Sequence, residues 1–319
     1  MSKLFIIGSG FTKGLVDNAP LNNDLLGVIS SSGDESAREI QARYGDDIEV
    51  ALTRLDLDVS GDRDAAHLLD LRRRIEHAIS TFFTTYRFGY QINCLATTTW
   101  VRPFISSTFS PGDVVVSLNY DCLFEGLADD NGLWSPNGGY GGSMQSVPTE
   151  DDKSAITVLK PHGSENFHRE PALGHDEINC FEFEIDESLF PRSGKGRHFC
   201  TTSRGNKPGI IAPSYVKVYP SILISIYLNA LWFADSANRL ILIGCSVRKE
   251  DQLLHTLIWR FIQGFVRDTG RRIIILDPRA KEISGRLNSI FEYPIYSAVY
   301  PVENSLENGW NELVGLLKE

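Results

Sequence analysis

Short apolar runs recur along the chain, each close to a glycine, proline, aspartate or asparagine. The runs cover Leu4–Ile7, Val114–Val116, Ile156–Leu159, Ile210–Ile211, Leu240–Ile243 and Ile273–Leu276. Continuous apolar runs of this length, bounded by turn residues, are typical of strands buried on both faces of a parallel sheet.

Helical patterns separate most of these runs. Within Ala65–Tyr86, apolar side chains recur at intervals of three or four residues with charged residues between them, which predicts an amphipathic helix. Val216–Ala234 and Gln252–Arg267 have helical patterns as well. Strands that alternate with helices indicate βαβ units. We therefore predict an α/β fold in which residues 1–319 form one Rossmann-like domain with a doubly wound parallel sheet.

Three stretches depart from this alternation. Residues from about 60 to 110 look helical throughout, which predicts a helical module inserted beside the sheet. Irregular insertions are expected at about 129–148, a glycine-rich segment, and at about 164–207. Loops of this length in compact domains are usually functional, for example as lids, although a plain surface loop is the alternative.

Composition narrows the class of protein. The chain has 319 residues, of which 42% are hydrophobic, and a net charge of −10, so we expect a globular protein that does not bind nucleic acid directly. Its five scattered cysteines include no C-x-x-C pair, which fits reduced thiols in the cytoplasm and argues against a structural zinc. The longest apolar stretch, Ile222–Phe233, is too short to span a bilayer.

A glycine turn follows the first apolar run. Gly8, Ser9, Gly10, Phe11 and Thr12 could bring backbone N–H groups close to a pyrophosphate. The spacing through Gly14 is G-x-G-x-x-x-G and no acidic residue ends a second strand about 20 residues later, so a nicotinamide dehydrogenase is not supported. A tight structural turn explains the glycines equally well.

Polar side chains follow the later strands too. Asn119 and Asp121 come after Val114–Val116, and His162 comes after Ile156–Leu159, where side chains lie at the ligand-binding edge of an open α/β sheet. Histidine is suited to proton transfer near neutral pH. The alternatives are that Asp121 caps the next helix and that His162 is a surface residue.

Two further strand ends have candidate ligand contacts. Gly244 and Ser246 follow Leu240–Ile243 in a turn of small residues that suits a phosphate or a ribose. Asp277 follows Ile273–Leu276 and could accept hydrogen bonds from a ribose, with helix capping as the alternative.

Taken together, these motifs resemble the sirtuins, and particularly the bacterial sirtuin-like NAD hydrolases of antiphage defence. The resemblance covers about residues 4–280 and rests on the glycine turn at Gly8–Thr12, Asn119-Tyr120-Asp121, His162-Gly163-Ser164 and Gly244-Cys245-Ser246. The zinc cysteines of the protein deacylases and their Phe-Arg step after the glycine turn are both missing, which favours the hydrolase branch.

The resemblance implies an enzyme that cleaves the nicotinamide–ribose bond of NAD, its substrate, to give nicotinamide and ADP-ribose without a metal. Its catalytic residues would be His162 as general base, Asn119 as the residue that orients the ribose and water, and Asp121 as the partner of the carboxamide. The residues that it implies for the rest of NAD are Gly8, Ser9, Gly10, Phe11, Thr12, Gly244, Ser246 and Asp277.

Two other functions stay open. A sensor of NAD or ADP-ribose would use the same pocket without turnover, and a protein deacylase is the less favoured alternative. Because the sirtuin-like domain fills most of the chain, we expect a cytoplasmic defence effector that forms a homo-oligomer or acts with a separate sensor, ATPase or Argonaute-like protein.

Overall fold

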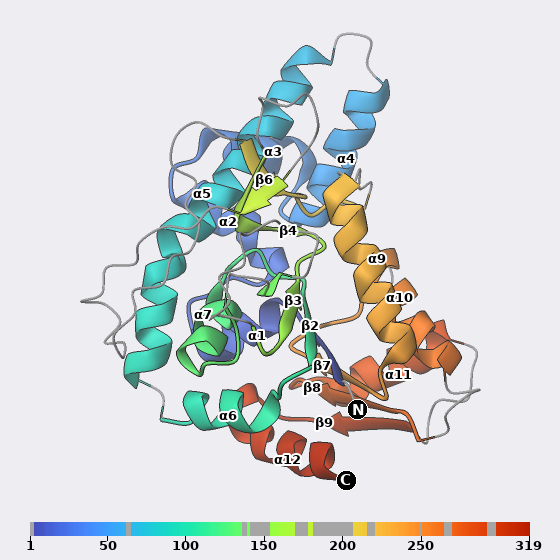
Figure 1. Ribbon diagram of the computed structural model, residues 1–319. Helices are drawn as coiled ribbons and strands as arrows, with labels where there is room; N and C mark the ends of the chain where they lie inside the picture. Colours follow the sequence, from blue (N-terminus) through green and yellow to red (C-terminus); the bar gives the residue numbers. More distant parts are fainter. Residues whose placement is uncertain are drawn as a thin grey trace.

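A six-stranded parallel sheet forms the centre of the protein (Figure 1). The computed structural model describes residues 3–61, 65–97, 99–135, 139–140, 154–169, 178–180, 207–215, 221–248, 251–264, 270–291 and 298–319. The strand order is β3-β2-β1-β7-β8-β9, and all five neighbouring pairs are parallel. The strands are β1 (Lys3–Ile7), β2 (Val114–Ser117), β3 (Thr157–Leu159), β7 (Arg239–Ile243), β8 (Arg272–Leu276) and β9 (Val299–Val302). This order confirms the Rossmann-like, doubly wound class predicted from the sequence.

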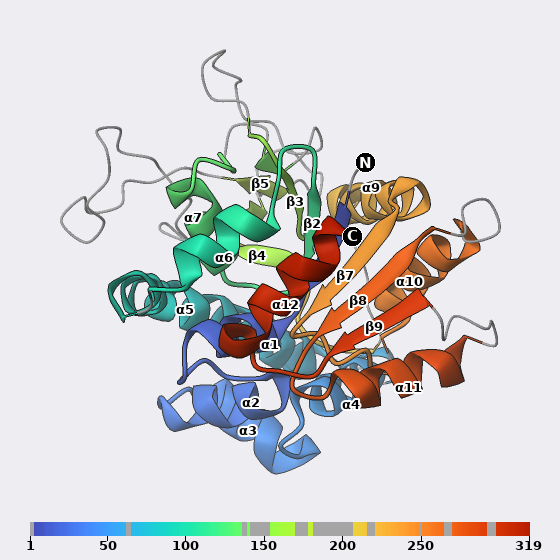
Figure 2. The same ribbon diagram turned by 90° about the horizontal axis from the view of Figure 1, so that it is seen from below.

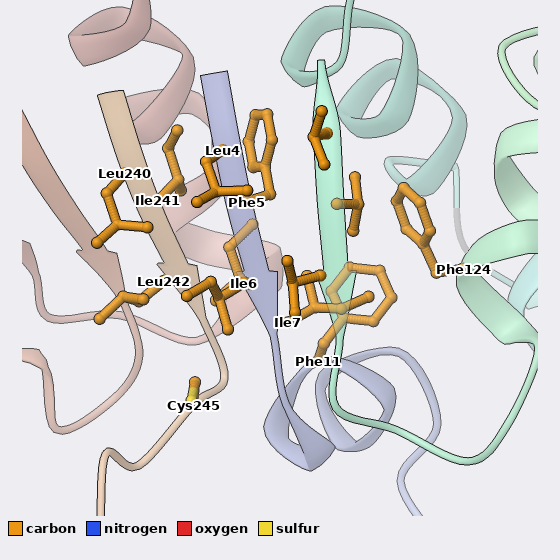
Figure 3. Packing of buried hydrophobic residues seen from close by; sticks show 14 of the residues in the cluster. Leu4, Phe5, Ile6, Ile7, Phe11, Phe124, Leu240, Ile241, Leu242 and Cys245 are labelled. Atoms are coloured by element: carbon orange, nitrogen blue, oxygen red, sulfur yellow. The ribbon is translucent and has the colours of Figure 1, made fainter. Parts of the chain in front are cut away.

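The central strands are buried on both faces, as their unbroken apolar runs predict. Leu4, Phe5, Ile6 and Ile7 of β1 are completely buried, and β1 lies between β2 and β7 (Figure 3). Helices cover both sides of the sheet. Helices α6 (Val101–Thr108) and α12 (Leu306–Lys318) lie on one side, and α9 (Ser221–Ser236) and α10 (Gln252–Gln263) lie on the other (Figure 2).

A helical module lies beside one end of the sheet. It spans residues 22–97 where about 60–110 was expected, because α6 packs with α12 on the face of the sheet. Its helices are α2 (Asn22–Ser31), α3 (Glu35–Tyr44), α4 (Ile48–Gly61) and α5 (Ala66–Thr97). They bury a second hydrophobic cluster, to which Leu26, Leu52 and Ile75 each contribute a completely buried side chain. The sequence pattern did not reveal α2 and α3 because a helix of 10 residues shows few turns of periodicity.

A small antiparallel sheet follows the main sheet along the chain. Its order is β5-β4-β6, with β4 at Gly163–Arg169, β5 at Ile178–Cys180 and β6 at Lys207–Ile210. The apolar run Ile210–Ile211 was predicted as a strand of the parallel sheet, but Ile210 is the last residue of β6 in the antiparallel sheet. Two apolar residues cannot distinguish a parallel from an antiparallel partner.

The two expected insertions are described only in part. Within 129–148, α7 (Leu123–Asp130) ends, and Trp134 and Tyr140 pack in the main core at a ring distance of 5.1 Å. Positions 136–138 and 141–150 lie outside the described residues, as do 170–177 and 181–206 of the second insertion. In the part of the chain that is described, no helix is both long and apolar enough to span a bilayer.

Candidate functional site

A cavity of about 370 Å³ opens beyond the carboxyl ends of the central strands. Between β1 and β7 the chain changes the side of the sheet to which it adds strands, and ligands of open α/β sheets bind at that switch point. Asn119, Asp121 and His162, the three residues expected at the reaction centre, all line this cavity. The helical module supplies the facing wall, including Glu49 of α4 and Phe83 of α5.

Glycines allow the loops after β1 and β7 to touch. A Cβ atom on Gly8 would lie 2.7 Å from the Gly244 carbonyl oxygen, and one on Gly10 would lie 2.8 Å from the Gly244 Cα. The backbone N–H of Gly10 donates to the Gly244 carbonyl at 2.9 Å, and that of Gly8 donates to Ile243 at 3.1 Å. These two N–H groups serve the packing of the two loops, so a ligand phosphate must find its donors elsewhere in the turn.

Gly244→Ala is expected to destabilise the fold. Gly244 has a φ of +58°, and a Cβ there would lie 2.1 Å from the backbone nitrogen of Phe11. Overpacking costs about 1–3 kcal/mol and a left-handed backbone about 1–2 kcal/mol, so the free energy of unfolding should fall by about 2–5 kcal/mol. Urea unfolding measures this change. Gly285→Ala is the control, because a Cβ on this glycine of α11 (Ala280–Ile290) meets nothing within 4 Å. It should leave stability unchanged or raise it.

Helix α1 (Ser9–Leu15) has one face toward the cavity and the other toward the core, so the residues of the glycine turn lie on different sides. Ser9 and Thr12, three positions apart, line the cavity. Phe11 is completely buried and packs edge-on against Phe124 at a ring distance of 5.8 Å (Figure 3). Of the expected cofactor residues, those on the described cavity wall are Gly8, Ser9, Thr12, Gly244 and Ser246.

Gly10, Phe11 and Asp277 lie elsewhere. Gly10 packs on Gly244, and Phe11 belongs to the hydrophobic core. The carboxylate of Asp277 accepts a hydrogen bond at 2.8 Å from the backbone of Arg279, next to the start of α11. This contact holds the turn before α11. It is not the helix cap that the sequence left open as the alternative for Asp277, because Arg279 is the N-cap residue and no side chain caps α11.

Asn119, Thr12 and Asp121 form one buried hydrogen-bonded group. The amide nitrogen of Asn119 donates to the Gly8 carbonyl at 3.0 Å and to the Thr12 hydroxyl at 3.1 Å. The Thr12 hydroxyl in turn donates to Asp121 Oδ2 at 2.9 Å. A carbonyl can only accept, so the Gly8 contact fixes which end of the Asn119 amide faces the protein. The amide oxygen of Asn119 is then the atom that a ligand can meet.

Asp121 accepts a hydrogen bond at the start of α7 and also lines the cavity. Its Oδ1 accepts from the backbone N–H of Leu123 at 3.1 Å, at the first residue of α7, which is the capping role. The residue also lines the cavity, where its side chain is only 5% exposed. A carboxylate offers about four acceptor positions, so these contacts leave room for a ligand donor.

The turn between β3 and β4 holds His162 at the cavity wall. Its carbonyl accepts from the Ile211 N–H at 2.8 Å, and the side chain is 8% exposed. The next residue, Gly163, has a φ of +78°, and a Cβ there would lie 2.0 Å from the Gly209 carbonyl oxygen. The glycine after His162 is therefore required by this turn.

A buried lysine fixes the backbone behind the site. Lys160, completely buried, donates to the Asp121 carbonyl at 2.5 Å and forms an ion pair with Glu125 at 2.9 Å. Burial disfavours the charged lysine, but the Glu125 carboxylate raises the pKa of Lys160 above its usual value, so it stays protonated. Burial raises the pKa of Glu125, and Lys160 opposes that shift.

The cavity mouth contains an ion pair that no local sequence pattern indicates. Arg248 donates to Glu49 at 2.5 Å, although the two residues are 199 positions apart. The side chain of Asn22 donates to the other Glu49 oxygen at 3.1 Å. Since the partners come from α2, α4 and the loop after β7, only the folded chain brings them together.

No family model and no curated protein sequence matches this chain. Among solved structures, a Sir2 homolog–NAD complex is 12% identical, with 99% of this chain and 89% of that chain covered and a TM-score of 0.39. A Sir2–p53 peptide–NAD+ structure is 10% identical, with 99% and 93% covered and a TM-score of 0.45. A mutant of a Sir2 homologue with ADP ribose is 13% identical, with 99% and 92% covered and a TM-score of 0.44. With TM-scores below 0.5, the fold assignment rests on the sheet order of this chain.

Cysteine chemistry does not fit the site. Cys245 lines the cavity, but burial raises the pKa of its thiol to about 12. Burial likewise raises the pKa of Cys122, behind the site, well above its usual value. Both thiols are neutral at pH 7, whereas a nucleophilic cysteine reacts as the thiolate. Within the described residues, no group of three or more His, Cys, Asp or Glu side chains is arranged to hold a metal ion.

Proposed function

We propose that the protein hydrolyses NAD+ at its nicotinamide–ribose bond and releases nicotinamide and ADP-ribose. One observation carries this proposal: the Asn119–Thr12–Asp121 group and His162 share the wall of one cavity at the switch point of a Rossmann-like sheet. The nicotinamide of NAD+ is a cationic leaving group, and the cleavage passes through an oxocarbenium-like state at the ribose C1′ carbon. Polar groups that are already positioned where charge develops lower the barrier to such a reaction.

Each residue then has a defined task in the proposed reaction. Asp121 accepts a hydrogen bond from the carboxamide NH₂ group of nicotinamide. The amide oxygen of Asn119 orients the attacking water at the ribose, since its amide nitrogen is held by Gly8 and Thr12. His162 accepts a proton from that water or from a ribose hydroxyl. Water supplies the hydroxyl of the ADP-ribose product, and the carbon–nitrogen bond electrons leave with nicotinamide.

The remaining part of NAD would lie along the glycine turns. The Ser9 hydroxyl is suited to a phosphate oxygen, because Ser9 and the backbone at Gly8 line the cavity at the switch point. Ser246 and the backbone at Gly244 line the same wall and suit the adenosine side. Asp277 is not needed for this pose, since its carboxylate already accepts a backbone hydrogen bond at the start of α11.

Incubation of the purified protein with NAD tests the proposal. Chromatography should detect nicotinamide and ADP-ribose in equal amounts, from the protein alone or after forced oligomerisation. If ADP-ribose raises the melting temperature but NAD remains intact in both states, the protein is a sensor and the proposed reaction is wrong. Deacetylation of an acetyl-lysine peptide would instead support the deacylase alternative.

The cellular role and the partner of the protein are proposed from its motifs and from one exposed apolar helix face. We propose a cytoplasmic antiphage effector that acts as a homo-oligomer or with a partner protein, because of the motif resemblance. The exposed apolar side chains of Ile224, Leu228 and Trp232 on α9, spaced four residues apart, support a contact with another chain.

A further inference from the structure

The described cavity wall carries more negative than positive charge, which disfavours an anionic dinucleotide. Among the described lining residues, Glu49, Asp121 and Asp251 are acidic, and Arg248 is the one lysine or arginine. A dinucleotide carries two negative charges on its diphosphate. Its affinity therefore depends on whether Arg248 is free to meet those charges.

Arg248 is engaged by the helical module. One Nη donates to Glu49 at 2.5 Å, and the other donates to Asn23 at 3.4 Å. Asp47 lies further away, with 3.9 Å between its carboxylate oxygen and the guanidinium. The Arg248 side chain is 29% exposed and that of Glu49 is 16% exposed, so the pair sits at the mouth, where an ion pair is weak and a ligand can compete for it.

The loop that carries Arg248 is held in place from behind. Arg286 of α11 donates to the Ser246 carbonyl at 2.6 Å and to the Val247 carbonyl at 3.2 Å. Val247 is buried with a φ of +47°, a left-handed conformation that is rare for a β-branched residue. Strain of this kind persists where the surroundings impose it and is concentrated at ligand-binding sites. The hydrogen bonds from Arg286 thus fix the backbone next to Arg248, while the Arg248 guanidinium extends to Glu49 on the opposite wall.

We infer that Arg248 selects ligands that carry a diphosphate, and that Glu49 competes with the diphosphate for it. When the ligand binds, its phosphate oxygens replace the Glu49 carboxylate as the acceptors of the Arg248 guanidinium. Asn22 keeps its hydrogen bond to Glu49. Arginine is suited to this exchange because its planar fork of donors matches a carboxylate and a phosphate equally well. Glu49 thereby lowers the affinity for every ligand with a phosphate and leaves the affinity for uncharged nucleosides unaffected.

The inference rests on the proposed function for its choice of a dinucleotide, but its test measures binding alone. Calorimetry would compare ADP, which has a diphosphate, with adenosine, which has none. Glu49→Gln should tighten ADP binding by about 1.5- to 5-fold, the range that solvent-accessible ion pairs set. Arg248→Gln should weaken ADP binding by about 10- to 100-fold. The ADP affinity of Arg248→Lys should lie between those of the unmodified protein and Arg248→Gln. Adenosine affinity should stay the same in all variants.

Asp47→Asn is the matched control, because it removes an equal charge 3.9 Å from Arg248 without breaking the close pair. An increase in ADP affinity equal to that of Glu49→Gln would mean that net charge alone acts, and would overturn the inference. So would unchanged or weaker ADP binding by Glu49→Gln, or an equal loss of ADP and adenosine binding by Arg248→Gln. If the ADP affinities of the variants rank as expected but the protein releases no nicotinamide from NAD, the proposed reaction is wrong and the role of Arg248 stands.

Discussion

His162→Ala is expected to slow the release of nicotinamide from NAD by about 10²–10⁴-fold, the usual contribution of a general base. His162 lines the cavity with a side chain that is 8% exposed, and the turn that holds it depends on its backbone and on Gly163. Loss of the imidazole should therefore leave the fold intact. Chromatographic rates at saturating NAD, together with a melting curve, measure the two effects separately.

A histidine outside the cavity provides the control for this experiment. His77 is exposed on α5, and its removal as His77→Ala should leave the rate of NAD cleavage at the level of the unmodified protein. A His162→Ala variant that melts normally and still cleaves NAD at the full rate would contradict the assigned role. ADP-ribose binding by His162→Ala should persist, since the proposed phosphate contacts lie in other loops.

The position of the cavity could be predicted from the sequence because it follows from the sheet. Buried parallel strands have continuous apolar runs, and the ends of Leu4–Ile7, Val114–Val116 and Leu240–Ile243 meet at one edge whatever the connections are. That rule alone brings Asn119 and Asp121 to the cavity. The turn residues were harder, because the choice between Ser9 and Phe11 depends on where α1 begins and on which of its faces meets the core.

The opposite wall of the cavity could not be predicted in the same way. Glu49 lies on α4, which has no catalytic motif and an ordinary helical pattern. Its importance comes from a contact with Arg248 at a separation of 199 residues, which no local pattern encodes. For the same reason β9 was missed: Val299–Val302 contains a tyrosine and a proline, and it becomes a strand only by pairing at the edge of the sheet with β8.

Lys160→Met is expected to lower the free energy of unfolding by about 3–5 kcal/mol, the usual cost of breaking a buried ion pair by removing one partner. The substitution leaves Glu125 completely buried without its counter-ion and leaves the Asp121 carbonyl without its 2.5 Å hydrogen bond. Urea unfolding at pH 7 measures the loss. Adding Glu125→Gln to Lys160→Met should restore part of it, because the uncompensated charge is then gone.

A surface pair with the same chemistry shows whether burial causes the effect. Lys281 and Glu303 lie 2.6 Å apart, but their side chains are 72% and 38% exposed, so Lys281→Met should leave the unfolding midpoint unchanged.

The pH dependence of the stability of Lys160→Met gives a second check. Burial raises the pKa of Glu125 even in the intact pair, and loss of Lys160 removes the group that opposes this shift. A carboxyl whose pKa is higher in the folded than in the unfolded state destabilises the fold increasingly as the pH rises above the unfolded value of about 4.3. The deficit of Lys160→Met should therefore be smallest in acid and grow toward neutral pH, and a deficit that is the same at every pH would contradict the role of Glu125.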